Sequence, residues 1–166
     1  MAPLMPTENS RTSLGQIVLP VFFISSSPEE TFTLGMRLAS LLEKGSIVAL
    51  SGPLGAGKTC FTKGIAAEIG VKEELTSPTY TIVSEYEGSR HFYHIDVYRL
   101  RGDDDFAAIG GEEIVFGDGI SVIEWSERIP AFIPPDAFKV DIEIIEDGKR
   151  RIRFYREDMS NMESEK

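Results

Sequence analysis

Short apolar runs alternate with polar and glycine-containing segments along most of the chain. β-branched and aromatic residues dominate most of these runs, which is typical of strands. Two other segments repeat apolar residues every three or four positions, as helices with one buried face do. The predicted strands cover residues 21–25, 46–51, 79–88, 91–100, 120–125, 139–145 and 151–155, and the predicted helices cover 28–44 and 58–69.

Residues with clear preferences for helix ends mark the limits of both predicted helices. Ser27 can cap the first helix, Pro28 suits its first turn, and Glu29 complements the positive end of the helix. Gly45 is a suitable C-terminal cap for this helix, and the second helix is predicted to stop near Gly70.

Turn-forming residues join two pairs of predicted strands. GSR at 88–90 and EDGK at 146–149 predict antiparallel hairpins, whereas the run SIVALS is typical of a strand buried on both faces of a sheet. The chain is therefore predicted to form an α/β domain whose central sheet mixes parallel and antiparallel strands and is flanked by helices. We expect one domain at 21–156, a flexible leader at 1–20 and a disordered tail at 157–166.

The charge balance limits the partners that such a domain can bind. The 166 residues include 17 basic and 27 acidic side chains, which gives a net charge of −10. This surface repels nucleic acid unless basic groups cluster or a partner supplies them, so we expect no DNA partner. The single cysteine excludes an intramolecular disulfide, and no apolar run reaches the length of a membrane span. In the absence of a recognisable targeting signal, we expect a cytoplasmic protein.

Residues 52–59 have the sequence GPLGAGKT, which matches the phosphate-binding pattern G-x-x-x-x-G-K-T. Its glycines allow backbone N–H groups to turn inward around a phosphate, and the following helix directs its positive end at the anion. Lys58 is placed to reach the β- and γ-phosphates of a nucleotide, and Thr59 to ligate Mg²⁺. A plain glycine turn is the weaker explanation, because the match lies between a predicted strand and a predicted helix.

Hydrolysis of a bound nucleotide also requires an acidic group near the end of a neighbouring strand. Asp96 in HFYHIDVYRL and Glu124 in SVIEW are the candidates. Strand alternation predicts that Asp96 shares a face with His94 and Tyr98, and a buried carboxylate is costly unless it is paired or binds metal. The alternatives are that Asp96 faces water on an edge strand, and that Glu124 forms an ion pair with Arg128.

Other polar residues near these motifs carry weaker signals. The loop Thr76–Tyr80 either senses a γ-phosphate or is a simple Ser-Pro turn, and both interpretations stay open. His91 and His94 lack the cysteines or paired acids of a zinc site, so we expect structural roles. Cys60 has no histidine partner and is expected to pack as a small hydrophobe, and Glu127 is expected in a solvated turn.

Four motifs follow one another along the chain: GPLGAGKT, SPTYTIV, YHIDVYRL and VIEWSERI. In this order and spacing they resemble the TsaE family of small bacterial ATPases, from about residue 27 to residue 129. The first motif alone is shared by many families, whereas the set of four is specific. The resemblance implies a P-loop NTPase-like fold and an ATPase that acts with TsaD and TsaB in threonylcarbamoyladenosine modification of tRNA. ATP hydrolysis in this family supports multiple turnovers of that complex, and the contact with tRNA could belong mainly to the partners.

The resemblance also implies how the acidic and hydroxyl groups act on ATP and Mg²⁺. Thr59 ligates the metal, and Glu124 matches the family's metal-associated acid. Asp96 matches an aspartate near the nucleotide, where it positions water or contacts a metal ligand. Which of the two acids activates water stays open.

Further positions are carried over from the family by their place in the motifs. The helix start near Pro28 and Glu29 is expected to approach the nucleoside, as is an arginine after the last turn, Arg150 or Arg151. Trp125 is either a contact surface or a core residue. The residues expected to bind the nucleotide are Pro28, Glu29, Gly52, Gly55, Ala56, Gly57, Lys58, Thr59, Cys60, Asp96 and Arg150, and those expected to be catalytic are Lys58, Asp96 and Glu124.

Two other functions are compatible with the sequence. A small P-loop kinase needs a second substrate pocket and an arginine-bearing lid, and no lid-like insertion is evident. A nucleotide-gated interaction module would order the Thr76–Tyr80 loop in its ATP state and hydrolyse ATP negligibly. A GTPase is disfavoured, because the sequence contains no N-K-x-D stretch to recognise guanine.

Overall fold

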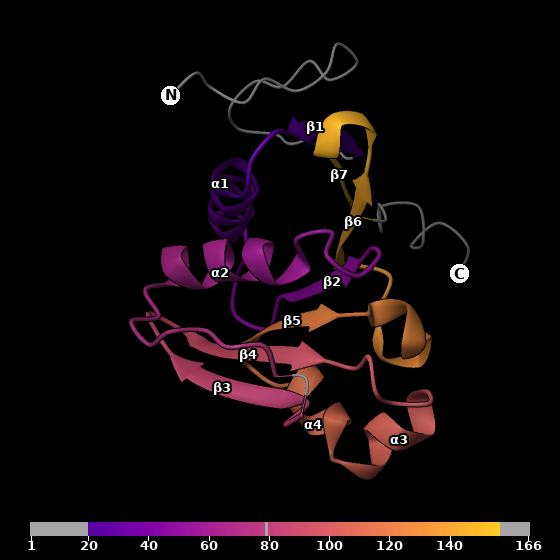
Figure 1. Ribbon diagram of the computed structural model, residues 1–166. Coiled ribbons are helices and arrows are strands. Elements are labelled where there is room, and N and C mark those ends of the chain that lie inside the picture. Colours follow the sequence, from indigo (N-terminus) through magenta and orange to yellow (C-terminus); the bar gives the residue numbers. More distant parts are fainter. Residues whose placement is uncertain (1–19, 79, 157–166) are drawn as a thin grey trace, which may run out of the picture.

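The computed structural model describes residues 20–78 and 80–156. A seven-stranded sheet runs through these residues in the order β1-β7-β6-β2-β5-β4-β3 (Figure 1). Its strands are β1 (Val21–Ser25), β2 (Ile47–Ser51), β3 (Val83–Glu87), β4 (His91–Asp96), β5 (Ile120–Glu124), β6 (Phe138–Ile144) and β7 (Arg150–Tyr155). The predicted α/β fold with a mixed sheet is confirmed.

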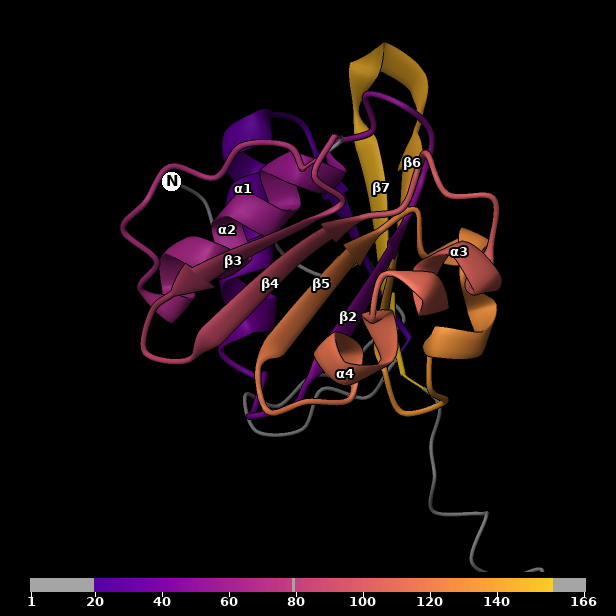
Figure 2. The ribbon, with the colours of Figure 1, turned by 90° about the horizontal axis from the view of Figure 1, so that it is seen from below.

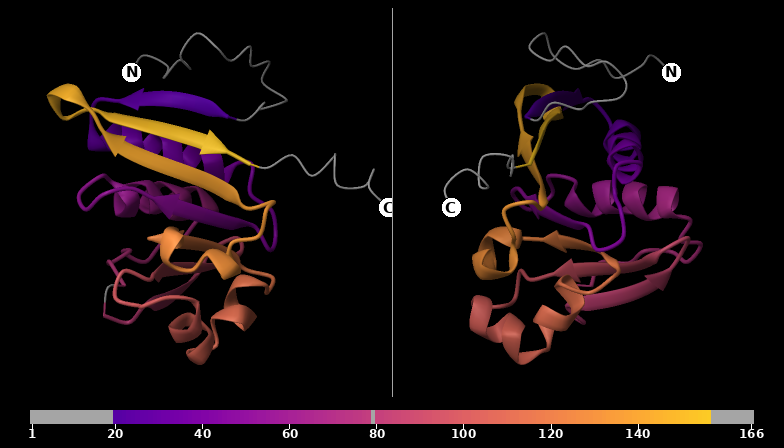
Figure 3. Two further views of the ribbon diagram at one scale, coloured as in Figure 1. Left: turned by 90° about the vertical axis from the view of Figure 1, so that its right-hand side faces the viewer. Right: turned by 180° about the vertical axis from the view of Figure 1, so that it is seen from behind.

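The parallel strands occupy the middle of the sheet. β2 lies parallel to β5 and β6, and β4 lies parallel to β5. β3 pairs antiparallel with β4, while β7 pairs antiparallel with both β6 and β1 at the opposite edge (Figure 3). Parallel neighbours bring their carboxyl ends to the same edge, so Leu50 lies opposite Glu124, and Glu124 lies opposite Asp96. This edge carries the candidate site, as in other open α/β sheets.

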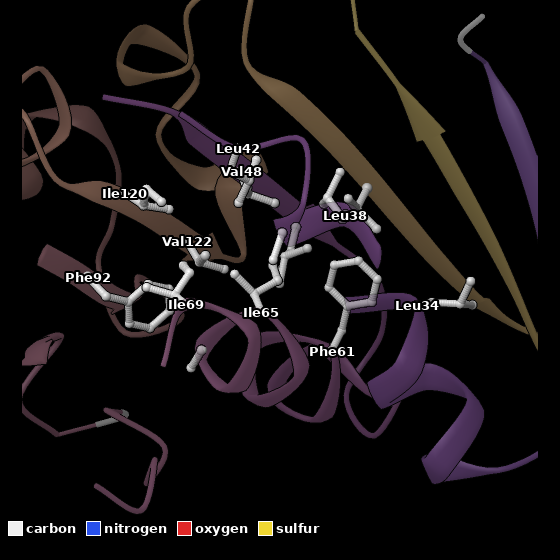
Figure 4. Close-up of a cluster of buried hydrophobic side chains, with 14 of the residues drawn as sticks. Leu34, Leu38, Leu42, Val48, Phe61, Ile65, Ile69, Phe92, Ile120 and Val122 are labelled. Carbon is white, nitrogen blue, oxygen red and sulfur yellow. The ribbon is translucent and has the colours of Figure 1, made fainter. Parts of the chain in front are cut away.

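Helices cover both faces of the sheet. They are α1 (Pro28–Ala39), α2 (Lys58–Ile69), α3 (Asp103–Ala108) and α4 (Gly111–Val115), with 3₁₀ turns at Ser126–Arg128, Pro130–Phe132 and Glu146–Gly148. α1 and α2 lie on one face, and α3 and α4 lie on the other (Figure 2). Phe61 and Ile65 of α2 join Leu34 of α1 in the buried cluster on the first face (Figure 4). Phe106 of α3 belongs to the separate cluster on the second face.

The helix α1 begins as predicted but ends earlier. The Ser27 hydroxyl accepts a hydrogen bond from the N–H of the third helical residue at 3.2 Å and so caps the helix. The prediction that Gly45 caps the other end is wrong, because the helix ends at Ala39. The apolar stripe continues past this point because Leu42 is still buried in the turn that follows. Gly45 instead belongs to the loop into β2, where its N–H donates to the carbonyl of Asp118 at 3.0 Å.

The helices α1 and α2 cross in close contact at two glycines. A Cβ atom at Gly35 would lie 2.2 Å from the carbonyl oxygen of Phe61, and one at Gly64 would lie 2.0 Å from that of Phe32. Neither position has room for a side chain, because close-packed backbone cannot yield by this amount. The crossing therefore fixes α1 against the helix that follows the GPLGAGKT motif.

We expect Gly64→Ala to lower the free energy of unfolding by about 3 kcal/mol, since the added methyl group forces the two helices apart. Urea unfolding measures the change. Gly102→Ala is the matched control, because a Cβ there comes no closer than 3.8 Å to another heavy atom, the carbonyl oxygen of Arg128. Equal losses of stability in the two variants would contradict the close crossing.

The structure contains every predicted strand and both predicted helices, and the hairpin strands β3 and β4 are shorter than predicted. The helices α3 and α4 were not predicted from the sequence. The expected leader at 1–20, apart from Pro20, and the expected tail at 157–166 lie outside the described residues.

In the described part of the chain, no helix combines the length and the apolar character that a bilayer crossing requires.

Candidate functional site

The segment between β2 and α2 forms a tight loop at the carboxyl edge of the sheet (Figure 1). Gly52, Gly55 and Gly57 have φ angles of 146°, 75° and 109°. Glycine adopts such angles without the steric cost that a side chain would bring. Gly52 is also packed against the backbone of β6, because a Cβ there would lie 2.4 Å from the carbonyl oxygen of Ile142.

The start of α2 has no negatively charged partner in its own helix. Its N-cap residue, Gly57, makes no side-chain hydrogen bond, and its first turn contains no acidic residue. The helix α1 differs, since Ser27 caps it and Glu29 and Glu30 lie in its first turn. The N–H groups of the first turn, which have no partner within the helix, and the positive end of α2 therefore suit an anionic ligand such as a phosphate.

Lys58, the first residue of α2, folds its side chain back over the loop. Its ammonium group donates to the carbonyl oxygens of Gly52 at 2.6 Å and Pro53 at 3.0 Å, and lies 3.9 Å from the ring centroid of Trp125. Burial lowers the pKa of Lys58, and the negative charges of Glu124 and other nearby acids oppose this effect. The chain thus holds a buried cation directly beside the loop.

Glu124, the last residue of β5, is buried and connects β5 to α2. The Thr59 hydroxyl donates to the two carboxylate oxygens of Glu124, at 2.9 Å to Oε1 and 3.2 Å to Oε2. His94 Nε2 lies 2.9 Å from the same Oε1 atom. The alternative of an ion pair with Arg128 is wrong, because that guanidinium donates instead to the carbonyl of Leu100 at 3.3 Å. A hydroxyl and a carboxylate of the kinds that bind Mg²⁺ therefore meet at the head of α2.

Asp96, the last residue of β4, is also buried at this edge, with 5% of its surface exposed. β4 lies between β3 and β5, so the alternative of a water-facing carboxylate on an edge strand is wrong. Asp96 Oδ1 accepts a hydrogen bond from the N–H of Tyr98 at 2.9 Å. Tyr98 lies beyond the end of the strand and is exposed, so it does not share the strand face as predicted. Burial raises the pKa of Asp96, while the Tyr98 N–H acts in the opposite direction.

We expect Asp96→Asn to raise the melting temperature of the ligand-free protein at pH 7. Since the pKa of Asp96 is higher in the folded state than in the unfolded chain, its charged form destabilises the fold above the folded pKa. The difference between the two proteins should disappear as the pH falls below the ordinary aspartate pKa of about 3.9, where the folded and unfolded states are both protonated.

Asp105→Asn serves as the control for this measurement. Hydrogen bonds from Arg101 lower the pKa of Asp105, so its charged form is not a source of strain. Thermal melts that show no gain for Asp96→Asn at pH 7, or an equal gain for Asp105→Asn, would contradict the assigned cost of burying Asp96.

The two candidate arginines near the last turn have different positions. Arg150 donates to the carbonyl oxygens of Ala56 at 2.9 Å and Gly55 at 3.1 Å, so it lies against the loop. Arg151 pairs with Glu143 at 2.5 Å on the neighbouring strand. Arg150 is therefore the arginine that the fold brings to the loop, and its contact with a nucleoside remains a prediction.

The N-terminus of α1 lies beside the first turn of α2. The Cys60 thiol donates to the carbonyl oxygen of Pro28 at 3.2 Å, and Glu29 is near enough to influence the thiol electrostatically. Burial is the main cause that raises the pKa of Cys60, which disfavours the reactive thiolate and agrees with a packing role. Pro28 and Glu29 are thus close to the loop, as their expected approach to the nucleoside requires.

Two residues with left-handed backbone flank the site. Trp125, with φ of 62°, follows Glu124 directly, is half-buried and packs its ring 4.8 Å from that of Tyr98. Ile82, with φ of 65°, accepts the backbone hydrogen bond of Asp96 at 2.8 Å. Such angles cost about 1–2 kcal/mol each outside glycine and concentrate at functional sites.

The Thr76–Tyr80 loop ends just before Ile82. Thr79 of this loop lies outside the described residues, and the role of the loop stays a prediction.

The residues at this edge fit a magnesium ion that a nucleotide brings with it. Among the residues that the structure describes, no group of three or more His, Cys, Asp or Glu side chains is arranged to hold a metal. Magnesium in nucleotide sites usually takes one or two protein oxygens and completes its shell with phosphates and water. Thr59 and Glu124 suffice for this arrangement.

Comparison with known proteins agrees with this geometry. The family described as threonylcarbamoyl adenosine biosynthesis protein TsaE matches residues 25–152. The chain belongs to the TsaE family. The TsaE protein of Treponema pallidum is 45% identical over 129 residues, which are 78% of this chain and 96% of that protein. The TsaE protein of Bacillus subtilis is 37% identical over 77% of this chain and 80% of its own length.

A solved structure resembles this TsaE-family chain as a whole. The crystal structure of Bacillus subtilis YdiB superposes with a TM-score of 0.72 and 32% sequence identity, over 87% of this chain and 90% of that one. The resemblance that four motifs indicated is therefore confirmed at the level of family and fold.

Three contacts of this TsaE-family site were not anticipated from the sequence. His94 contacts the carboxylate of Glu124, Lys58 lies over Trp125, and Arg150 donates to two carbonyls of the loop. Only His94 carried a signal, because strand alternation already placed it on the face of Asp96. The other two depend on how distant segments meet in the fold.

Proposed function

We propose that this chain binds ATP with Mg²⁺ and hydrolyses it in support of tRNA threonylcarbamoyladenosine biosynthesis, together with TsaD and TsaB. Membership of the TsaE family supports the pathway, and relatives of this chain carry it in their names. The observation that carries the hydrolysis proposal is the contact of Thr59 with Glu124, beside a helix start that lacks an internal anion.

The described side chains divide the work around a triphosphate. The N–H groups of the loop and of the first turn of α2 bind the phosphates, and the Lys58 ammonium leaves its carbonyl partners to pair with the β- and γ-phosphates. Thr59 and Glu124 are the residues that would hold the metal. Magnesium, when bound, neutralises charge that develops on the phosphate oxygens. Asp96, buried at the same edge, orients the attacking water.

The charge of the chain supports a role for its partners in binding the tRNA. A net charge of −10 disfavours direct binding of tRNA, so the partners provide most of the RNA contact. We propose that these reactions take place in the cytoplasm, where tRNA and ATP are both present.

Phosphate release from Mg-ATP tests this function, measured for the chain alone and with TsaD, TsaB and tRNA of the same organism. We expect slow release by the chain alone and several-fold faster release in the complete mixture. Transfer of labelled phosphate to a small acceptor would indicate a kinase instead. Calorimetry that shows no Mg-ATP binding, with or without the partners, would refute the proposal.

One observation favours a nucleotide-gated interaction module as the second candidate. Lys58 contacts Trp125, whose ring packs on the exposed Tyr98, so a ligand that withdraws the lysine changes the surroundings of surface residues. ATP-dependent binding to TsaD and TsaB with no phosphate release would support this candidate over the ATPase.

A further inference from the structure

We propose that His94 is a positioning residue that holds the carboxylate of Glu124 in place for the metal; this rests on the proposed ATPase function. Both side chains are almost completely buried, His94 at 0% and Glu124 at 3% exposure. They lie on adjacent parallel strands, β4 and β5, and His94 Nε2 is 2.9 Å from Glu124 Oε1.

The hydrogen-bonding pattern places a proton on Nε2 of His94 and not on Nδ1. His94 Nδ1 is buried and has no hydrogen-bond partner among the described residues. A proton on Nδ1 would leave a buried donor unpaired and would set the Nε2 lone pair against a carboxylate oxygen, which are two unfavourable contacts. The Nε2–H tautomer leaves only an acceptor unpaired and donates to Glu124.

The two residues that donate to Glu124, Thr59 and His94, would respond differently to a bound metal. The Thr59 hydroxyl donates to both carboxylate oxygens of Glu124. If this hydroxyl ligated a metal, its hydrogen bonds with Glu124 would change. His94 comes from the sheet rather than from α2, so it can keep Oε1 fixed. Oε2 then remains oriented toward the head of α2.

A purely space-filling role explains His94 less well. The neighbouring inward position on β4 is Phe92, an apolar residue buried to the same extent. A leucine would fill such a site without leaving a ring nitrogen unpaired. A buried polar group costs free energy unless it makes a hydrogen bond, so the hydrogen bond of His94 is the feature that distinguishes it from a leucine. In the fold, that partner is the carboxylate at the candidate metal position.

The decisive experiment compares His94→Leu with His94→Gln. Leucine keeps volume and removes the donor, whereas the glutamine amide can donate at a similar reach. With a non-hydrolysable ATP analogue bound, we expect Mn²⁺ affinity, measured by electron paramagnetic resonance, to fall about tenfold or more in His94→Leu. The kcat for ATP should fall by a similar factor with little change in KM, and His94→Gln should recover most of both losses.

Nucleotide affinity measured in EDTA checks that the variants keep a folded site. His94→Leu with wild-type Mn²⁺ affinity and kcat would overturn the positioning role, as would a His94→Gln variant as defective as His94→Leu. Loss of nucleotide affinity in EDTA by both variants would also overturn it, because the defect would then lie in the fold.

A spectroscopic measurement tests the pairing without any nucleotide. The chain has two histidines. His91, which is half-buried and pairs with Glu87, can be replaced by glutamine to leave one ring signal. We expect ¹⁵N NMR to show the Nε2–H tautomer for His94 and a changed Nε2 shift in Glu124→Ala. An Nδ1–H tautomer would refute the inference. If the tautomer is as expected but wild type binds no ATP, the proposed function fails while the pairing stands.

Discussion

Lys58→Ala is expected to weaken the binding of Mg-ATP by about a hundredfold or more. The variant removes the cation closest to the loop, and loss of one partner of a buried charge pair costs about 2–5 kcal/mol, or roughly 30- to several-thousandfold in affinity. Lys58 is 5% exposed and already lies at the loop, whereas Arg150, which also contacts the loop, is held by the carbonyls of Gly55 and Ala56. Isothermal titration calorimetry measures the loss.

Lys63→Ala provides the matched control for Lys58. Lys63 is exposed on the same helix, so its removal changes the net charge equally without touching the loop. We expect affinity within about twofold of the wild type, since exposed charges are screened by salt. Equal effects of the two substitutions would place the nucleotide elsewhere on the molecule.

Glu124→Gln is expected to lower the rate of ATP hydrolysis by about a hundredfold or more, with ATP affinity reduced far less. The substitution keeps the volume of the side chain, and the amide oxygen can still accept hydrogen bonds from Thr59 and His94. It removes the negative charge that the metal needs. Single-turnover phosphate release separates the chemical step from binding. Such a split between binding and rate marks a group that acts in the transition state.

Glu127→Gln controls for the general loss of negative charge near the loop. Glu127 is exposed three residues further along, in the 3₁₀ turn Ser126–Arg128, and its charge acts on Lys58 from outside the site. Hydrolysis near the wild-type rate is expected. A Glu124→Gln variant as active as Glu127→Gln would remove Glu124 from the reaction.

The sequence predicts elements well where one local pattern specifies them. SIVALS and the GPLGAGKT motif are contiguous, so strand, loop and helix follow without knowledge of the rest of the fold. The helices α3 and α4 are six and five residues long, too short for a 3.6-residue periodicity to stand out. The end of α1 was misjudged because burial of Leu42 extends the apolar stripe beyond the hydrogen-bonded helix.

The site was predictable residue by residue, but its contacts were not. Asp96 and Glu124 are recognisable as acids at strand ends, whereas their position side by side depends on the strand order β5-β4. The contact between His94 and Glu124 joins residues 30 positions apart and requires both the order and the register of those strands. Local sequence patterns specify neither the order nor the register of strands, because strand pairing depends on the packing of the whole sheet.

The contacts of Lys58 within the chain have a kinetic consequence. Its ammonium group donates to two loop carbonyls and lies over the indole ring of Trp125. An anion that binds in the loop must therefore displace these contacts. The side chain is thus an intramolecular competitor for its own binding site. Competition of this kind lowers the net affinity and favours rapid exit of a spent ligand, without weakening any contact made in the complex.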